Sequence, residues 1–347
     1  MEDSQFKLSI KSKSSIYFVE ELNSLSSFLY EKYDLVIVDN KVFKSHNIRI
    51  TGPLIKINST EKAKEYKEII EIFELMLSLG LNRSSKVLAI GGGVIQDIVT
   101  FASSLYFRGI EWDFMPTTLL AMGDSCIGGK SSINFNSTKN VIGNFHPPGC
   151  IYLYVGFLKT LNESNLKSGI GELYHYAFLN KVSDFNWYNR LLGKGFSELT
   201  SFDYQALVHR TLNIKKEIIE EDEFDKARRL FNNWGHTIGH AIETVSNFKI
   251  PHGQAVLAGI SLELKLLKLV NKKSYEKYQD IVNLIISEYG YDNLPDFNCY
   301  DLFNIIKKDK KNLPGKIAIV NLKEIEKIEL LYVEESVYLS YLKIAVQ

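Results

Sequence analysis

The segment from Arg229 to His240 places four polar side chains at helical spacing. They are Arg229, Asn233, His236 and His240, which are separated by four, three and four residues. On a helix this spacing puts all four on one stripe. A buried core face does not suit such a stripe, because each side chain would need a polar partner. Lysine and glutamate would be commoner on a solvated face, so the pattern predicts a helix over 229–246 that lines a polar cavity.

A divalent metal site is the chemistry that this stripe suggests. His236 and His240 could share one ion, as in HExxH proteases, but the segment reads HTIGH and lacks the glutamate of that motif. We therefore expect only one of the two to be a ligand. Glu172, three residues before His175, and His252, at the start of another predicted helix, are candidates for the other ligands. One glutamate and two histidines form a known catalytic zinc set, although such residues in isolation are more often surface or satisfied core residues.

The turn Gly91-Gly92-Gly93 is a candidate for binding a dinucleotide. It follows a predicted strand over 86–90 and precedes a predicted helix over 94–104. Glycine lets the backbone approach a pyrophosphate, whose charge is favoured at a helix N-terminus. Asp39, at the end of a predicted strand over 34–39, could accept a hydrogen bond from a ribose hydroxyl. The turn is not a GxGxxG motif, and a tight turn without a ligand explains these residues about as well.

A polar, glycine-rich stretch follows over residues 116–140. Within seventeen residues it combines paired glycines with acidic, amide and basic side chains, namely Asp124, Asn134, Asn140, Lys130 and Lys139. Ammonium groups neutralise a phosphate or carboxylate, amides add donors, and glycine exposes backbone N–H groups. The mixture favours an anion-binding pocket over a plain surface loop.

The elements that must position these residues form two domains. Two predicted strands flank a predicted helix over 61–79, which is the βαβ pattern of a parallel sheet. The apolar spacing of that helix predicts a buried face, formed by Tyr66, Ile69, Ile70, Phe73, Met76 and Leu77. After about Asn162, helical patterns dominate until a strand-like run near 316–320. We expect an α/β domain over 1–162 and a mostly helical domain over 163–347.

The bulk composition excludes several classes of protein. The 347 residues include 41 Lys plus Arg and 41 Asp plus Glu, so the formal net charge is zero. A general nucleic-acid or membrane-surface binder would need a basic excess. No apolar run approaches the ~20 residues that span a bilayer. The first residues lack a signal-peptide pattern, and the three cysteines form no CxxC pair. We therefore expect a cytoplasmic protein without nucleic-acid or membrane partners.

Ten short blocks stand in the order and spacing of the 3-dehydroquinate synthases and their relatives, the sugar phosphate cyclases. The blocks are GGGVIQD (91–97), YFRG (106–109), PTTLL (116–120), DSCIGGK (124–130), KNVIG (139–143), LKTL (158–161), GIGELYHYA (169–177), NNWGHTIGHAIE (232–243), PHG (251–253) and DKK (309–311). The similarity spans about residues 34–320. It implies a Rossmann-like α/β N-terminal domain, a mostly α-helical C-terminal domain, and a homodimer that binds a small sugar phosphate.

The resemblance also implies which residues form the sites. Zinc, with cobalt as an alternative, would be held by Glu172, His236 and His252. Residues that match the family's NAD site are Asp39, Glu61, Lys64, Gly92, Gly93, Asp97, Thr117, Thr118, Asp124, Ser125, Lys139 and Thr160. Positions that match substrate contacts are Asp124, Lys130, Asn140, His175, Lys215, Arg229, Asn233, His240 and one of Lys310 and Lys311. Arg108 resembles an arginine that reaches the phosphate site across the dimer interface.

The family reaction explains why both cofactors are expected. A ring hydroxyl is oxidised by NAD, phosphate leaves by β-elimination, the hydride is returned, and the opened ring closes into a carbocycle. Zinc holds the reacting hydroxyl. By resemblance, the phosphate would be held by Lys130, Asn140, Asn233 and His240. Arg229 and Lys215 would hold the other end of the substrate, and the guanidinium fork suits a carboxylate.

One departure from the family pattern bears on the substrate. His175 stands where the dehydroquinate synthases have a lysine, and the two side chains differ in charge and in number of donors. Gln96 also replaces a small residue of the family, and this change is expected to be tolerated. The sequence therefore favours 3-dehydroquinate synthase itself, with a seven-carbon 2-keto-acid sugar phosphate as substrate. A cyclase of the same family acting on another sugar phosphate, for example sedoheptulose 7-phosphate, is the alternative. An NAD- and zinc-dependent polyol dehydrogenase is the alternative from another class, although a neutral polyol needs no phosphate pocket.

Overall fold

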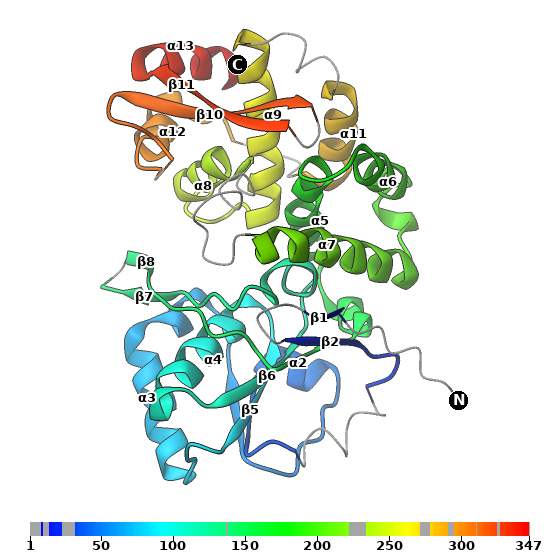
Figure 1. The fold of residues 1–347 in the computed structure, drawn as a ribbon, viewed down its shortest axis with the longest axis vertical. Helices are drawn as coiled ribbons and strands as arrows, with labels where there is room; N and C mark the ends of the chain where they lie inside the picture. Colours follow the sequence, from blue (N-terminus) through cyan, green and yellow to red (C-terminus); the bar gives the residue numbers. More distant parts are fainter. Residues whose placement is uncertain are drawn as a thin grey trace. The chain divides into compact units, whose positions relative to one another are not determined.

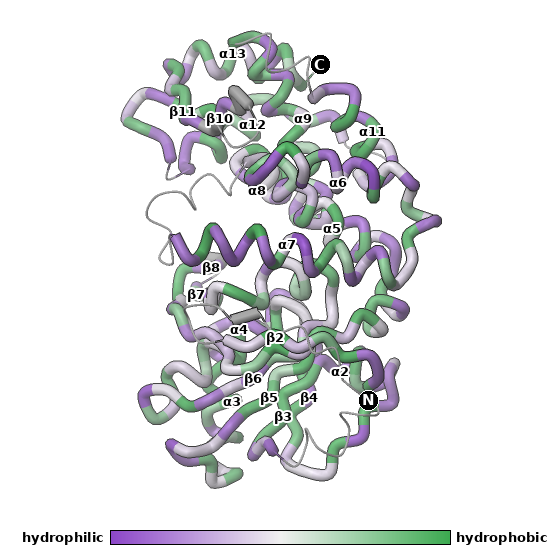
Figure 2. The backbone as a smooth tube through the Cα atoms, turned by 45° about the vertical axis from the view of Figure 1, so that its right-hand side comes forward, coloured by the Kyte–Doolittle hydropathy of each residue, from purple (hydrophilic) through white to green (hydrophobic). Residues whose placement is uncertain are grey.

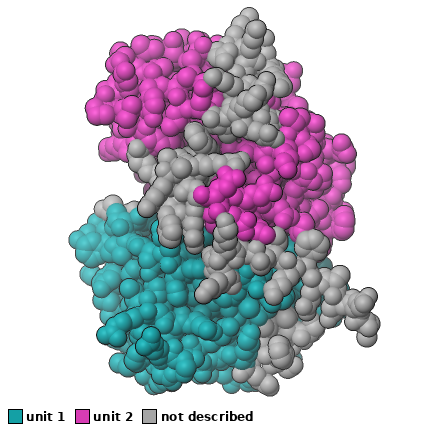
Figure 3. All heavy atoms as spheres, in the orientation of Figure 1, with its two compact units in different colours: residues 1–162 teal, residues 163–347 magenta. Residues whose placement is uncertain are grey.

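The chain forms two compact units, Met1–Asn162 and Glu163–Gln347 (Figure 3). The computed structural model describes residues 8–9, 14–22, 32–136, 138–221, 234–270, 278–290, 295–309, 311–324 and 327–346. Among these residues, no helix combines the length and the apolar character that crossing a bilayer would require.

A seven-stranded sheet forms the centre of unit 1 (Figure 1). In sheet order its strands are β1 (Leu8–Ser9), β2 (Ser15–Phe18), β9 (Cys150–Leu153), β6 (Glu111–Pro116), β5 (Lys86–Gly91), β3 (Leu35–Asp39) and β4 (Leu54–Ile57). All neighbours are parallel except β1 and β2. The central strands β3 and β5 are almost continuously apolar and buried, as parallel strands covered on both faces require (Figure 2).

The strand order reverses at β3. The next strand along the chain, β4, pairs on one side of β3, and β5 pairs on the other. In open parallel sheets, ligands bind beyond the carboxyl ends of the strands at such a reversal. Here those ends are Asp39 and Gly91, the two positions at which the sequence predicts dinucleotide contacts.

Short helices and a hairpin complete unit 1. They are α2 (Asn40–Ser45), η1 (Glu61–Lys64), α3 (Tyr66–Ser78), α4 (Gly93–Leu105), η2 (Tyr106–Arg108), the π-helix η3 (Ala121–Ser125), η4 (Val155–Thr160), β7 (Ile133–Phe135) and β8 (Thr138–Ile142). The predicted helix over 61–79 is therefore divided into η1 and α3.

The buried face predicted for α3 is partly wrong. Ile69 and Met76 are buried, together with Ile72. Tyr66, Ile70 and Leu77 lie on the surface, with Leu77 68% exposed. The helix carries apolar residues on two faces, and helical spacing alone does not identify which face packs against α4 and the rest of unit 1.

Unit 2 is mainly helical. Its elements are α5 (Glu163–Tyr174), η5 (His175–Phe178), α6 (Val182–Leu192), η6 (Phe196–Glu198), α7 (Ser201–Glu221), α8 (His236–Val245), α9 (His252–Val270), α11 (Gln279–Tyr289), α12 (Cys299–Ile306), β10 (Lys316–Glu324), β11 (Lys327–Glu334) and α13 (Glu335–Val346). The strands β10 and β11 form an antiparallel hairpin, which includes the predicted run near 316–320.

One predicted helix of unit 2 starts later than its pattern indicates. The prediction of a continuous helix over 229–246 is wrong, because Gly235 has a left-handed backbone (φ 78°) and α8 begins at His236. A left-handed residue interrupts the helical hydrogen-bond ladder. Arg229 and Asn233 lie outside the described residues, so the four-residue stripe is described only for His236 and His240.

Candidate functional site

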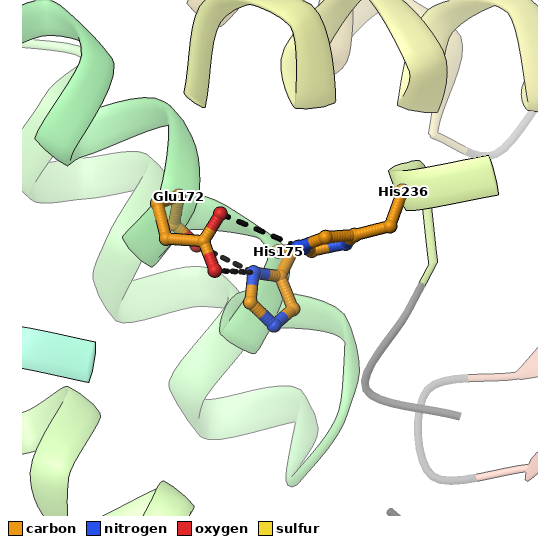
Figure 4. A group of neighbouring side chains, drawn as sticks. All are labelled: Glu172, His175 and His236. Carbon is orange, nitrogen blue, oxygen red and sulfur yellow. Dashed lines mark hydrogen bonds and ion pairs between the residues drawn. The ribbon is translucent and has the colours of Figure 1, made fainter. Parts of the chain in front are cut away.

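The side chains of Glu172, His236 and His252 converge in unit 2. Glu172 comes from α5, and the two histidines are the first residues of α8 and α9. The Glu172 Oε2 atom lies 3.4 Å from His236 Nε2 and 3.2 Å from His252 Nε2. Figure 4 shows the Glu172 carboxylate facing the His236 ring, with His175 beside it. Three segments that are distant in sequence therefore offer one oxygen and two nitrogens to a common point.

Glycines allow these helices to approach so closely. A Cβ atom on Gly253, next to His252, would lie 1.7 Å from the carbonyl oxygen of Ser168 on α5. A Cβ atom on Gly235, next to His236, would lie 2.8 Å from the carbonyl oxygen of Val256 on α9. His236 therefore follows, and His252 precedes, a position at which only glycine leaves room for the neighbouring backbone. This close packing sets the spacing of the cluster.

Hydrogen bonds orient both imidazoles in the same way. Glu243 Oε2 lies 3.0 Å from His252 Nδ1, and the backbone carbonyl of Trp234 lies 3.2 Å from His236 Nδ1. A carboxylate and a carbonyl only accept, so each Nδ1 donates, and the other ring nitrogen, Nε2, is the one that faces Glu172. The sequence analysis missed Glu243. Its position seven residues after His236, on the same face of α8, was the available signal.

The donor set fits a divalent metal ion. Ligands about 2.0–2.1 Å from a tetrahedral ion lie about 3.3 Å apart, close to the two distances measured here. The Glu172 Oε2 atom is buried without a hydrogen bond, as an atom reserved for another partner would be. Burial alone would raise the pKa of the Glu172 carboxyl, but the His236 and His252 imidazoles lower it well below its ordinary value. The carboxylate is therefore ionised and can act as a ligand.

His175 lies beside the cluster as the first residue of η5. It is buried (1% exposed), and its ring centre is 5.0 Å from that of His236. Its Nδ1 donates to the backbone carbonyl of Glu172 and lies 4.0 Å from Glu172 Oε1. Because Nδ1 donates to the carbonyl, this nitrogen does not offer a lone pair to the cluster. The structure thus places His175 against the backbone of Glu172.

His240 is exposed and lies one turn beyond His236. Its ring centre is 5.6 Å from those of both His236 and His252. His240, Glu243 and His252 form a second group whose possible ligand atoms lie within 4.8 Å of one another. Among the described residues, the other group that meets this criterion is Glu172, His175 and His236. His252 is therefore grouped with Glu243, to which it is hydrogen-bonded, and is linked to Glu172 by their 3.2 Å contact. That His236 is a metal ligand while His240 contacts the substrate stays a prediction.

The remaining predicted residues of unit 2 are placed unequally. Lys215 is buried on α7. Lys311 is also buried, 3.3 Å from Asp309 Oδ2, which accepts a hydrogen bond of 2.7 Å from Thr237, the residue after His236. The DKK block is therefore tied to the start of α8. Lys310 lies outside the described residues.

Glu263 is a buried residue that the sequence analysis did not single out. It lies on α9, and its carboxylate accepts a hydrogen bond of 3.0 Å from the backbone N–H of Gly235. Burial raises the pKa of Glu263 to about 7, with Gly235 and Lys311 opposing the shift. Glu263 therefore supports the backbone from which His236 projects.

In unit 1, the strand ends at the sheet reversal carry the predicted dinucleotide contacts. Asp39 ends β3 and caps α2, accepting from the backbone of Lys41 and Val42 at 2.7 and 3.0 Å. Gly92 is the N-cap of α4 and has no side-chain cap, so the first N–H groups of α4 are not covered by a capping side chain. A Cβ atom on Gly92 would lie 2.9 Å from Thr118 Cγ2. This arrangement suits a pyrophosphate.

A buried lysine joins several of the predicted residues. Lys64 Nζ lies 2.8 Å from Asp97 Oδ2, 2.9 Å from Asn140 Oδ1 and 3.7 Å from Glu61 Oε1. Asn134 closes the network by donating to Glu61 and accepting from the Asn140 backbone. Burial raises the pKa of Asp97 to about 6, against the opposing effect of Lys64. Residues predicted for cofactor and for substrate therefore meet in one network.

Gln96 makes specific contacts, although the sequence analysis expected only that this replacement of a small residue would be tolerated. Its amide nitrogen donates to the Ser125 backbone carbonyl at 2.5 Å, and its amide oxygen accepts from the Ser125 hydroxyl at 2.6 Å. Gln96 therefore holds the end of the π-helix η3, which contains Asp124. Such irregular turns are frequent at functional sites.

The other predicted residues of unit 1 are dispersed along it. Thr117 is buried, and Thr118 accepts from the Ala121 backbone at 3.2 Å. The Thr160 hydroxyl contacts His46 Nε2 at 2.8 Å, and Lys130 is exposed. The Lys139 side chain lies outside the described residues.

Arg108 is held in a strained loop. Phe107 and Arg108 both have left-handed backbones, with φ 46° and 67°, and both side chains are exposed. Two consecutive non-glycine residues in this region cost conformational energy, a feature that clusters at functional sites.

Comparison with known proteins covers both units. Residues 54–168 match the 3-dehydroquinate synthase N-terminal family model, and residues 169–312 match the 3-dehydroquinate synthase C-terminal model. The chain is 36% identical over 297 residues to a 3-dehydroquinate synthase from Alkaliphilus metalliredigens, a match that covers 82% of each protein.

Two solved structures share the fold. The first is 2-deoxy-scyllo-inosose synthase complexed with carbaglucose-6-phosphate, NAD+ and Co2+, with a TM-score of 0.81, 20% identity and coverage of 98% and 99%. The second is 2-epi-5-epi-valiolone synthase from Streptomyces hygroscopicus with NAD+ and Zn2+ bound, with a TM-score of 0.80, 21% identity and coverage of 99% and 97%.

Proposed function

Because the chain belongs to the 3-dehydroquinate synthase family, we propose that it is a sugar phosphate cyclase, with 3-dehydroquinate synthase as its specific activity. The observation that carries the proposal is the convergence of one carboxylate and two oriented imidazoles in unit 2. The matches in both units favour this activity over a polyol dehydrogenase. The polar network around Lys64 also offers more charged groups than a neutral polyol would need.

The proposed cofactors are NAD in unit 1 and zinc, or cobalt, in unit 2. The uncapped start of α4 at the sheet reversal supports the first, and the cluster of Glu172, His236 and His252 supports the second. Solved relatives of the same fold hold NAD+ with Co2+ or Zn2+. When bound, NAD supplies a hydride acceptor that is restored within the cycle, and the metal supplies Lewis acidity toward a hydroxyl.

The side chains of this protein would bind and orient the substrate. Lys130, Asn140 and the exposed His240 are proposed to hold the phosphate. Asn140 is already fixed through its carbonyl oxygen by Lys64, which leaves its amide nitrogen to donate. Asn233 of the family motif is proposed to join them at the phosphate. Lys215 is proposed to contact the other end of the substrate, together with Arg229 of the same motif. A placed set of donors contributes to catalysis mainly by fixing the reacting geometry.

His175 supports a second candidate substrate. An ammonium group carries a fixed charge and three donors, whereas the buried His175 ring has one nitrogen donating to the Glu172 backbone. Fewer donors at this position favour a substrate with a different hydroxyl pattern, such as sedoheptulose 7-phosphate. The same reaction class would then act on a substrate without the carboxylate.

We also propose a cytoplasmic homodimer. Ile70 and Leu77 are exposed on α3, and Leu105 and Phe107 are exposed at the end of α4 and in η2. An interface on this part of unit 1 would cover these side chains. The strained loop presents Arg108 beside the exposed Phe107, which supports a role for Arg108 in a partner's site. Sedimentation analysis tests the assembly: a monomer at micromolar concentration would contradict it.

Phosphate release tests the proposed activity. The purified protein is incubated with NAD and zinc, and with either the seven-carbon 2-keto-acid sugar phosphate or sedoheptulose 7-phosphate. Release from the first substrate supports 3-dehydroquinate synthase, and release only from the second assigns the chain to another cyclase. No release from either, with NADH accumulating in the presence of a polyol, would show that the cyclase proposal is wrong.

A further inference from the structure

We propose that Glu243 is a positioning residue that fixes His252 as a metal ligand. The inference rests on the proposed metal site and extends it to Glu243, which ends the block NNWGHTIGHAIE (232–243) and to which the sequence analysis gave no role. Glu243 Oε2 accepts a 3.0 Å hydrogen bond from His252 Nδ1, while His252 Nε2 lies 3.2 Å from Glu172 Oε2. The two carboxylates therefore lie on opposite edges of one imidazole ring.

The geometry gives Glu243 a definite chemical task. A carboxylate without a proton accepts only, so it selects the tautomer of His252 that carries hydrogen on Nδ1. The lone pair is then on Nε2, the nitrogen that faces Glu172. Carboxylates that accept from a ligating histidine fix its orientation and raise its basicity, and their loss typically reduces metal affinity by about 10–100-fold.

His252 needs such a partner more than His236 does. It is the first residue of α9, and its side chain is 32% exposed, against 9% for His236. Water can therefore reach the His252 ring more easily than the His236 ring. The Nδ1 of His236 instead donates to the backbone carbonyl of Trp234, a partner that no side-chain substitution removes.

Placement on α8 couples the two histidines. Glu243 lies seven residues after His236, so one helix supplies a ligand and also the carboxylate that orients a ligand on α9. A direct ligand role for Glu243 would have to use its other carboxylate oxygen or break the hydrogen bond from Oε2 to His252 Nδ1. The observed hydrogen bond favours positioning, and the experiment separates the two roles.

The test measures binding of Co2+ and Zn2+ alone to the metal-stripped full chain, by chelator competition and by the visible absorption of Co2+. Glu243→Ala should weaken binding by about 10–100-fold and shift the Co2+ absorption. Glu243→Gln should restore most of the affinity, because its amide oxygen can still accept from Nδ1. Glu335→Gln is the matched control: it breaks the 2.8 Å ion pair with Lys307 but touches none of the candidate ligands.

Two results would overturn the inference. Affinity within twofold of the wild type, with unchanged Co2+ absorption in Glu243→Ala, would show that the carboxylate does not orient His252. A Glu243→Gln variant as defective as Glu243→Ala would indicate direct ligation. Circular dichroism identifies variants that fail to fold. His236→Ala separates this inference from the proposed site: if the wild type binds the ion and His236→Ala does not, the metal site stands whatever Glu243 does.

Discussion

Replacing Gly253 by alanine should separate α5 from α9 and remove the metal from unit 2. The new Cβ would lie 1.7 Å from the Ser168 carbonyl oxygen and 2.7 Å from the Glu172 backbone nitrogen, whereas real Cβ contacts are essentially never shorter than 3.0 Å. Both atoms belong to backbone and cannot rotate away. The contact must therefore widen by at least 1.3 Å, the difference between 3.0 and 1.7 Å.

That displacement is large for a metal site. Gly253 is adjacent to His252 and the affected helix carries Glu172, so the 3.2 Å separation of their ligand atoms would change. Metal–ligand distances tolerate changes of about 0.2 Å. We expect zinc affinity to fall by more than about 100-fold, since even an outer partner contributes about 10–100-fold. Overpacking should also lower the free energy of unfolding by about 1–3 kcal/mol.

The assay is zinc content after dialysis against a weak chelator, followed by titration with Co2+. Gly52→Ala is the control, because a Cβ there meets nothing within 4 Å. Binding of NAD to unit 1, together with circular dichroism, reports whether the Gly253→Ala protein still folds. A folded Gly253→Ala protein that keeps wild-type zinc affinity would refute the argument that glycine packing sets the spacing of the ligands.

Three further predictions concern unit 1 and the metal. Gln96→Ala should weaken NAD binding by about tenfold in calorimetry, because two hydrogen bonds to Ser125 are lost; unchanged affinity would contradict that role. The folded-state pKa of Asp97, about 6, is raised from 3.8, so its contribution to stability is complete below about pH 4 and is lost as the pH rises through 6. Urea unfolding should show this loss in the wild type and not in Asp97→Asn. Chelation of the metal should abolish phosphate release, and added Zn2+ should restore it; activity that survives metal removal would contradict the proposed centre.

Local patterns in the sequence predicted the core of unit 1. The apolar runs that became β3 and β5 needed no tertiary information, because parallel strands buried on both faces are apolar at nearly every position. The triple glycine after the second strand predicted the turn into α4. For the metal cluster, residue types gave candidates, and only the similarity of the ten blocks selected Glu172, His236 and His252 among them.

Other features depended on contacts between distant segments. The outward position of Ile70 and Leu77 could not be deduced, because α3 has apolar residues on both faces and only its packing against α4 and β7 selects one. Gln96 was expected to be tolerated, but its amide meets Ser125, a contact between segments that no local spacing encodes. The Glu243–His252 hydrogen bond likewise joins two helices.

The sequence by itself determined which chemical groups this protein carries and the central strands of unit 1. Tertiary structure decided how these groups meet, since helical spacing relates only residues on one helix. The approach of Gly253 to Ser168 brings α9 against α5, and with it His252 within 3.2 Å of Glu172. Distances of this kind depend on how backbones pack, and packing is a property of the folded chain as a whole.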